Sequence, residues 1–191
     1  MKRIIRPLAG LALMLGSMGC SNKSSPPDPN KIPDLTTAEI AELRTLGDTA
    51  LKSASAGTKL LAACGASVGR SYYVVNDAAA ASEPDEQWVD DGITVGRIIL
   101  MEGPDGHPKA MFRDTTGELN DAVEDGASVG YALKPNENGD FGVIVFYPST
   151  GLTEVYNVIR NRKGSRIALW TTTKPNMTYF SKSGAFAARC L

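Results

Sequence analysis

Residues 141–173 read FGVIVFYPSTGLTEVYNVIRNRKGSRIALWTTT, and this stretch decides the fold class. Three runs rich in β-branched and aromatic residues alternate with two short turns, PSTG at 148–151 and NRKG at 161–164. Glycine in such turns supplies the positive φ that tight hairpins require. Connections this short join only antiparallel neighbours, because a parallel crossover needs a dozen residues or more. The stretch therefore predicts three consecutive antiparallel strands, the first of them apolar on both faces and central.

The same pattern extends in both directions from this stretch. From Arg70 onward, turn residues interrupt the chain about every ten positions. The expected architecture is mainly β, an antiparallel meander that forms a barrel or a sandwich. About eight strands are predicted: Ser71–Val75, Ile93–Glu102, Pro108–Arg113, Gly126–Lys134, Phe141–Tyr147, Leu152–Arg160, Ser165–Thr173 and a weaker one at Ala185–Cys190.

One N-terminal α-helix is expected before the strands. Thr36 and Glu39 have the spacing of a capping box, and Leu35 and Ile40 fit the accompanying hydrophobic staple. Gly57 is placed to end the helix. Residues 58–63 are ambiguous, with a second short helix as one option. Apolar residues recur at three- and four-residue steps, which predicts one buried stripe: Ile40, Leu43, Leu46, Ala50, Leu51 and Ala54.

Residues 1–19 have the features of a signal peptide. A basic head at 1–6 is followed at 7–18 by an apolar stretch of about a dozen residues. This stretch is too short for a membrane-spanning helix, which needs roughly twenty apolar residues. It is therefore predicted to be an export signal.

The cut point, Gly19-Cys20, resembles the end of a lipobox, the signal of the bacterial lipoprotein family. The resemblance implies that the Cys20 thiol takes up a diacylglycerol before the chain is cleaved just ahead of it. The family prefers Leu three residues before the cysteine, whereas this chain has Ser17 there, then Met18, with Leu15 two places too early. Ordinary signal-peptidase cleavage after Gly19 stays open, since Ser17 and Gly19 fit a small-x-small site.

The cysteine count bears on the same question. The chain has three cysteines, Cys20, Cys64 and Cys190. An odd number in an exported protein implies a free thiol or a cysteine used in other chemistry. If Cys20 carries lipid, Cys64 and Cys190 remain as a pair in an oxidising compartment, where a disulfide persists. A Cys64–Cys190 disulfide is expected, and two reduced core cysteines are the alternative.

Residues 20–34 are predicted to be a disordered tether, because they contain four prolines and almost no apolar side chains. Residues 35–191 suit a single β-rich domain. Ser21, in place of Asp after the cysteine, is similar to lipoproteins sorted to a Gram-negative outer membrane. That resemblance implies a location in the cell envelope, facing the periplasm or the surface.

Charge restricts the class of partner. Without residues 1–19 the chain has 17 basic and 21 acidic side chains, a net charge of -4. Nucleic-acid binders usually carry a basic surplus, so no nucleic-acid partner is expected. The expected partners are the membrane, through the N-terminal lipid, and either a protein or a small envelope-derived ligand.

A further resemblance covers roughly residues 64–190. It rests on ACG at 63–65, YY at 72–73, Trp88 ahead of DGI at 91–93, the hairpins that follow and the final cysteine. These features resemble a family of uncharacterised small exported proteobacterial proteins. No activity is established for that family, so the resemblance assigns no catalytic residue.

The pattern G-x-S-x-G occurs twice in identical form, at 65–69 and 126–130. In a hydrolase such a serine lies on a turn from a strand into a helix, with Asp and His later in the chain. Both copies here lead into strands. The chain's single histidine, His107, precedes Ser128, so only Ser67 has it in the hydrolase order. Packing of small residues at a strand entry is the favoured interpretation.

Metal sites are not indicated. One histidine cannot form a multi-histidine zinc site, and paired cysteines leave no thiolate to complete one. The acidic clusters at 83–86, 90–91 and 136–140 are interpreted as turns, and the last lacks the ligand spacing of a calcium loop. No cofactor is expected. A carboxylate pair suited to glycoside hydrolysis stays open, because the separation of two carboxylates depends on the fold.

Four side chains are candidate ligand contacts, because rings with polar tips suit binding sites and histidine titrates near neutral pH: Tyr72, Tyr73, Trp88 and His107. Three further rings, Tyr147, Tyr156 and Trp170, could also line a pocket, although most of these aromatic residues are expected in the core. The one dense basic run, 160–166, is interpreted as a solvated hairpin tip, with contact to lipid phosphates or lipopolysaccharide as the alternative. The leading hypothesis is a non-catalytic, lipid-anchored envelope domain with an unidentified ligand. The alternative is an envelope hydrolase that uses Ser67 or a carboxylate pair.

Overall fold

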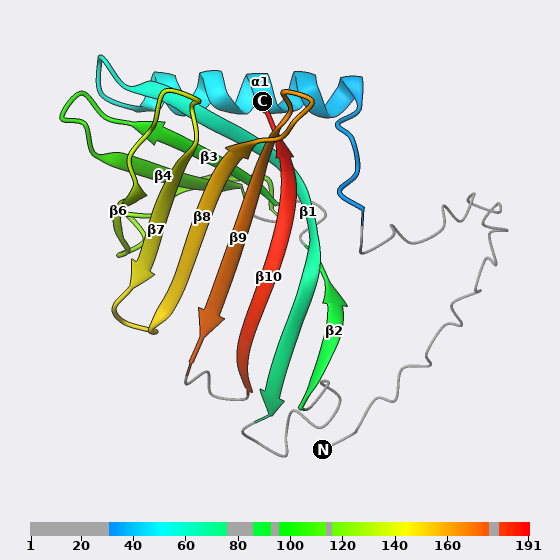
Figure 1. Cartoon of the computed structure of the whole chain (residues 1–191). Coiled ribbons are helices and arrows are strands. Elements are labelled where there is room, and N and C mark those ends of the chain that lie inside the picture. Colours follow the sequence, from blue (N-terminus) through cyan, green and yellow to red (C-terminus); the bar gives the residue numbers. More distant parts are fainter. Residues whose placement is uncertain (1–30, 76–85, 93–95, 114–115, 176–179) are drawn as a thin grey trace, which may run out of the picture.

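The computed structural model describes residues 31–75, 86–92, 96–113, 116–175 and 180–191. The predicted signal peptide, Cys20 and most of the predicted tether lie outside these residues. The described part is mainly β: an antiparallel sheet curls into a half-barrel, and one helix lies across one end of it (Figure 1). Its elements are α1 (Thr37–Ser53), β1 (Lys59–Val75), β2 (Gln87–Asp91), β3 (Arg97–Glu102), β4 (Pro108–Arg113), β5 (Leu119–Asp121), β6 (Ser128–Leu133), β7 (Phe141–Tyr147), β8 (Leu152–Arg160), β9 (Arg166–Lys174) and β10 (Phe180–Cys190).

Two meanders share the long strand β1. Strands β3 to β5 form one meander and β6 to β10 form the other, and β1 lies between them, paired with β3 on one edge and β10 on the other. Strand β2 pairs with the second half of β1, beyond the region that β3 covers. The predicted antiparallel architecture is confirmed. The described sheet has ten strands rather than about eight, since β2 and β5 were not predicted.

Residues 58–63 do not form a second helix, because β1 begins at Lys59. The start of β1 is covered on both faces. Ala62 and Cys64 belong to the core inside the half-barrel, whereas Ala63 packs beneath α1 on the convex side. A strand buried on both faces lacks the apolar-polar alternation that identifies a half-exposed strand. This double burial explains why the sequence left the segment ambiguous.

The predicted capping box at the start of α1 is present. The Glu39 backbone N–H donates to Thr36 Oγ1 at 3.2 Å, and the Thr36 backbone N–H donates to Glu39 Oε2 at 2.8 Å. The helix ends at Ser53, and Gly57, with a φ of +89°, belongs to the turn that leads into β1. Leu43 and Ala50 of α1 are fully buried against the convex side of the sheet.

An ionic contact ties α1 to the sheet. Glu42 of the helix lies 2.9 Å from Arg97 Nη2 of β3 and also pairs with Arg113 of β4. Arg97 is buried, so its charge depends on this carboxylate for compensation. The contact holds the helix over the meander that β3 begins.

The larger core fills the inside of the half-barrel. Phe141, Val143 and Val145 of β7 point into it, while Phe146 lies on the outer surface with 40% of its area exposed. Strand β7 is thus paired on both edges, as predicted for a central strand, and its outer face is partly exposed. Strand β3 is buried on both faces, because α1 covers its outer side.

The Cys64–Cys190 disulfide is formed, and it joins two residues that pair directly across β1 and β10. The two cysteines are separated by 126 residues in the sequence. The bond therefore links the end of the last strand to the strand that both meanders share.

Removing this bond should destabilise the fold strongly. In the double variant Cys64→Ala/Cys190→Ala, the free energy of unfolding is expected to fall by about 3–5 kcal/mol, because the cross-link restricts a long loop of the unfolded chain. Urea titrations of the variant and the parent, followed by far-UV circular dichroism, measure the change. Equal urea midpoints would contradict this account of the bond. Dithiothreitol should lower the midpoint of the parent and leave that of the double variant unchanged.

Candidate functional site

The concave side of the half-barrel contains a pocket of about 320 Å³. That volume lies in the range of small-molecule sites, roughly 300–1,000 Å³. Residues of β1, β3, β4, β5, β7, β8 and β9 and the neighbouring turns line it: Gly65, Gly96, Arg97, Ile98, Phe112, Arg113, Asn120, Asp125, Tyr147, Leu152, Glu154, Tyr156, Trp170 and Lys174. We call it the concave pocket.

A row of four aromatic rings lies along the concave pocket, and three of them, Phe112, Tyr156 and Trp170, form one of its walls. Tyr156, Trp170 and Phe186 are direct cross-strand partners on β8, β9 and β10, so their side chains share the concave face. The ring centroids of Tyr156 and Trp170 are 5.5 Å apart, and those of Trp170 and Phe186 are 5.0 Å apart. Phe112 of β4 extends the row, with its centroid 6.0 Å from that of Tyr156. Rings in such contact support one another, so the wall is rigid and largely apolar.

Two glycines make room for the last ring of this row. A Cβ atom at Gly69 would lie 2.7 Å from the Phe186 ring and only 2.1 Å from the Ala185 carbonyl oxygen, and one at Gly184 would lie 2.7 Å from the same ring. Gly69 closes the first G-x-S-x-G pattern. The glycine at position 69 of that pattern is therefore explained by the close packing of Phe186 against the β1 backbone.

Glu154 lies beside the aromatic row, two positions before Tyr156 on the same face of β8. The Tyr156 hydroxyl donates to Glu154 Oε2 at 2.7 Å. Burial raises the pKa of the Glu154 carboxyl, and this effect outweighs the opposing influence of the Tyr156 hydrogen bond and the Lys174 charge. The buried hydroxyl of Thr172, directly opposite on β9, lies against the carboxylate without an aligned hydrogen bond. The site thus holds a desolvated carboxyl group with spare hydrogen-bonding capacity.

A second polar cluster centres on Asp91 of β2, which faces the same concave side. Its carboxylate accepts hydrogen bonds from Ser71 Oγ at 2.8 Å and from the Tyr73 hydroxyl at 3.3 Å, and it forms an ion pair with Lys182 of β10. Lys182 Nζ also lies 5.2 Å from the centre of the Tyr73 ring. We call these residues the Asp91 cluster.

The electrostatics of the Asp91 cluster keep both charges in place. Burial acts to raise the pKa of Asp91, but hydrogen bonds from Lys182 and Ser71 outweigh it and lower the pKa. Burial also acts to lower the pKa of Lys182, but its bonds to Asp91 and Tyr73 hold the pKa above the usual value. A charged lysine and a weakly basic carboxylate do not deprotonate Ser71. The cluster is therefore suited to fixing side chains and not to activating a nucleophile.

Of the four candidate contacts, only Tyr73 lies on the concave side. Tyr72 and Trp88 point to the convex side, where their rings meet edge to face with centroids 5.6 Å apart and Trp88 is 52% exposed. His107 is exposed in the β3–β4 turn, where its backbone N–H donates to Asp105 Oδ1. Successive residues of a strand face opposite sides, so Tyr72 and Tyr73 cannot share one site.

The structure separates Ser67 from His107. Ser67 is buried in the middle of β1, whereas the turn that carries His107 follows Glu102, the partner of Lys59 at the start of β1. At the rise of a β-strand, Lys59 and Ser67 are roughly 25 Å apart. Ser67 therefore has no histidine base. The second G-x-S-x-G pattern begins at a turn, where Gly126 has a φ of +88°.

Sequence reasoning missed Glu154 and Lys182, whereas Tyr147, Tyr156 and Trp170 were among the rings predicted to line a pocket. For Glu154 a signal existed, because residues 154, 156 and 158 share one face of β8 and Val158 is apolar enough to mark that face as inward. Lys182 lies before the weakly predicted strand at 185–190, so no strand phase was assigned to it.

The described residues contain no group of three or more His, Cys, Asp and Glu side chains that could hold a metal ion. Among the helices in that part of the chain, none has the length and apolar character needed to cross a bilayer. Comparison with protein families, curated proteins and solved structures finds no match to this chain. The site must therefore be interpreted from its own chemistry.

Replacing Glu154 with Gln should change how stability depends on pH. Because the folded-state pKa of Glu154 is raised, its protonation stabilises the fold below the unfolded pKa, and this contribution is lost as pH rises through the folded pKa. Gln cannot ionise but still accepts the Tyr156 hydrogen bond. We expect Glu154→Gln to be more stable than the parent near pH 8 and equally stable near pH 4, below the usual glutamate pKa of about 4.3.

Urea midpoints of both proteins at the two pH values measure this difference. The exposed Glu137→Gln substitution, in the turn before β7, is the matched control and should show little change at either pH. A difference between Glu154→Gln and the parent that is independent of pH would contradict the proposed burial of the carboxyl.

Proposed function

We propose that this protein is a lipid-anchored binding domain of the cell envelope, and that its half-barrel holds a small amphipathic ligand in the concave pocket. The observation that carries the ligand proposal is the row of Phe112, Tyr156 and Trp170 beside the desolvated Glu154 carboxyl. An apolar ring or chain would lie on the aromatic row, and a hydroxyl or amine N–H would donate to Glu154. Apolar walls with a few convergent polar groups are typical of small-molecule sites.

Binding is favoured over catalysis because the polar groups of the Asp91 cluster are held in completed pairs. Asp91 accepts from two hydroxyl groups and Lys182, and Ser71 donates to a carboxylate that is a weak base. One observation favours a second candidate, a glycoside hydrolase. The pKa of Glu154 is raised while that of Asp91 is lowered, the pattern of an acid and a base in such enzymes.

Dye binding tests the concave pocket. The chain has two tryptophans, Trp170 in the aromatic row and Trp88 on the convex side, and these form a matched pair. Phenylnaphthylamine, a neutral aromatic amine, is expected to bind and gain fluorescence. Trp170→Leu should weaken its binding about tenfold, since the variant loses one ring of the wall. Trp88→Leu should leave binding unchanged.

The outcome can go against the proposal in two ways. Equal effects of the two substitutions, with both variants folded by circular dichroism, would mean that the dye binds elsewhere. Cleavage of aryl glycosides or envelope glycans that is abolished by both Glu154→Gln and Asp91→Asn would replace the binding proposal with the hydrolase.

The lipid anchor is supported by the sequence and by one structural fact. The apolar stretch before Cys20 and the proline-rich stretch after it have the order expected of an exported lipoprotein. The Cys64–Cys190 disulfide supports the proposal further, because it leaves Cys20 as the one cysteine of the three available for a lipid. Ser21 supports a place in the outer membrane by resemblance alone.

Mass spectrometry of the mature protein from a Gram-negative host tests the anchor. We expect an N-terminus at Cys20 with the added mass of a diacylglycerol and an acyl chain. Cys20→Ser should move the protein from the membrane pellet to the soluble fraction, whereas Cys64→Ser/Cys190→Ser should keep the lipid mass. An unmodified Cys20 after cleavage behind Gly19 would show ordinary export in place of lipidation.

A further inference from the structure

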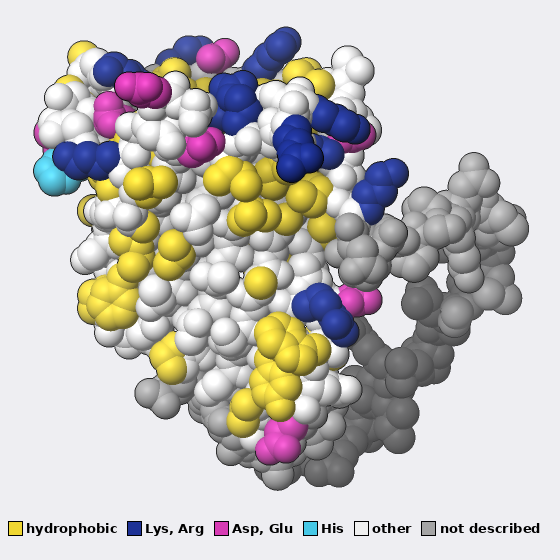
Figure 2. Space-filling view, in the orientation of Figure 1, with side chains coloured by type: hydrophobic (Ala, Val, Ile, Leu, Met, Phe, Trp, Pro, Cys, Tyr) yellow, Lys and Arg dark blue, Asp and Glu magenta, His cyan; other side chains and the backbone are white. Residues whose placement is uncertain are grey.

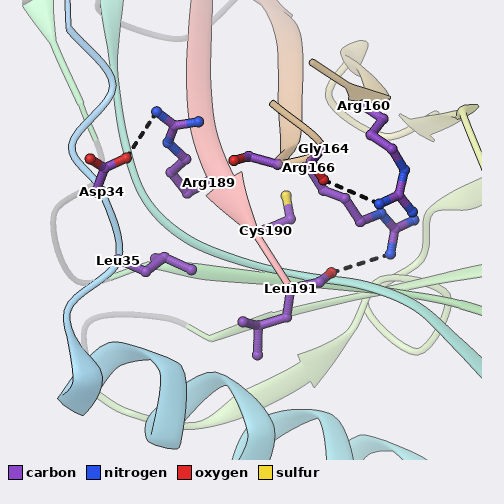
Figure 3. A pocket seen from close by; sticks show the side chains of 9 residues that line it. Asp34, Leu35, Arg160, Gly164, Arg166, Arg189, Cys190 and Leu191 are labelled. Atoms are coloured by element: carbon purple, nitrogen blue, oxygen red, sulfur yellow. Dashed lines mark hydrogen bonds and ion pairs between the residues drawn. The ribbon is translucent and has the colours of Figure 1, made fainter. Parts of the chain in front are cut away.

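A second pocket, of about 370 Å³, lies at the other end of the half-barrel. It is formed where the β8–β9 turn and the end of β10 meet the segment that leads into α1 (Figure 3). Three guanidinium groups line it, those of Arg160, Arg166 and Arg189, beside Asp34 and Leu191. We call it the arginine pocket. It shares no lining residue with the concave pocket.

Arg160 and Arg166 are forced together by the register of the sheet. They are direct cross-strand partners on β8 and β9, and their guanidinium groups lie side by side in Figure 3. Like charges at directly opposed positions destabilise a sheet. Burial first, and then the neighbouring charge of Arg160, lowers the pKa of Arg166. The pair therefore carries a cost that a bound anion would relieve.

Arg166 is built into the fold and cannot move away from its neighbour. It donates to the Leu61 carbonyl oxygen and to the main-chain oxygen of Leu191, and its guanidinium lies 5.8 Å from the centre of the Phe141 ring. Arg160 is exposed and donates to the Gly164 carbonyl oxygen at 3.1 Å. These contacts fix the positions of the two positive charges, and charges held in place in this way are preorganised for an anion.

Carboxylate side chains compensate these three arginines only in part. In the part of the chain that the structure describes, one of the three arginines forms an ion pair with a side chain: Arg189 lies 2.9 Å from Asp34. The Asp34 side chain is 85% exposed. An ion pair this exposed contributes little to stability, so a competing anion can replace Asp34 at low cost. Arg189 Nε is buried without a hydrogen-bond partner. The charge of Asp140 offsets part of the charge of Arg166. Asp140 accepts a hydrogen bond from the backbone N–H of Arg160, not from its guanidinium group.

The position of the arginine pocket indicates which anion it meets. Asp34 and Leu35 belong to the segment that joins the fold to the predicted tether, so in the proposed lipoprotein the arginine pocket lies next to the start of that tether. Most Lys and Arg side chains visible on this face lie toward the same end, near α1 and the β8–β9 turn, where several Asp and Glu side chains also lie (Figure 2). Arginine binds phosphate oxygens through paired N–H donors, and cations near an anionic bilayer are attracted to it.

We propose that the arginine pocket binds the phosphate groups of anionic membrane lipids and docks this end of the domain on the bilayer surface. The concave pocket plays no part in this contact. The docking also does not require the lipid on Cys20, so it can be tested without the anchor and can fail independently of the function proposed above.

The test uses the chain from residue 20 onward with Cys20→Ser, which contains the whole described fold and cannot be acylated. Co-sedimentation is measured with vesicles of phosphatidylcholine alone and of phosphatidylcholine mixed with phosphatidylglycerol. We expect binding to the mixed vesicles only. Arg160→Gln and Arg189→Gln should each weaken it about fivefold, the loss of one cation near the surface. Arg70→Gln, which removes the same charge from the convex side of β1, should weaken it much less.

Stability supplies a second readout that a purely structural role of Arg160 would not give. Arg160→Gln relieves the repulsion with Arg166, so its melting temperature without lipid should equal or exceed that of the parent. If Arg70→Gln weakens binding as much as Arg160→Gln, or if neither does, specific docking is wrong. If inorganic phosphate binds in a way that depends on Arg160 and mixed vesicles do not bind, the pocket takes a free phosphate and the proposal of a membrane lipid is wrong. If either Arg160→Gln or Arg189→Gln fails to fold, vesicle binding by the other variant still tests the proposal.

Discussion

Strand β1 pairs with β10 along most of its length, and the Cys64–Cys190 disulfide fixes the two strands to each other at one end. Since β1 also pairs with β3, this contact turns two local meanders into one sheet. A sheet of this size twists and curls, and the curl creates the inside of the half-barrel. Without the β1–β10 pairing, Tyr156 and Trp170 of one meander would lose Phe112 of the other, and the concave pocket would lose one wall.

The inside of the half-barrel is not arranged for stability alone. A core made only for packing would have apolar residues at the positions of Glu154, Asp91 and Lys182, because desolvating a charge costs free energy even when the charge is paired. Here the Asp91–Lys182 pair is completed by hydroxyl groups, while Glu154 keeps a raised pKa beside an apolar wall. Local departures from the rules of core packing of this kind are typical of sites that bind something.

The local parts of the fold follow from the sequence, and the long-range parts do not. The hairpins β7–β8 and β8–β9 and the cap at Thr36 depend on residues close in the chain, and they were predicted. The start of β1 was missed because its second apolar face is explained only by α1 packing on it. The same limit applies to the site. Tyr73 was chosen for its ring, but its meeting with Asp91 and Lys182 depends on the register of β1 with both β2 and β10.

Strand β8 links the two proposed sites. Glu154 lies near one end of it and Arg160 is its last residue, roughly 20 Å away at the rise of a β-strand. A domain docked on lipid phosphates through the arginine pocket would therefore hold the concave pocket away from the bilayer, with β8 between them. A ligand would then reach Glu154 from the aqueous side and would not have to leave the membrane. This arrangement favours a ligand with modest apolar area and a hydrogen-bond donor over a long acyl chain, in agreement with a pocket of about 320 Å³.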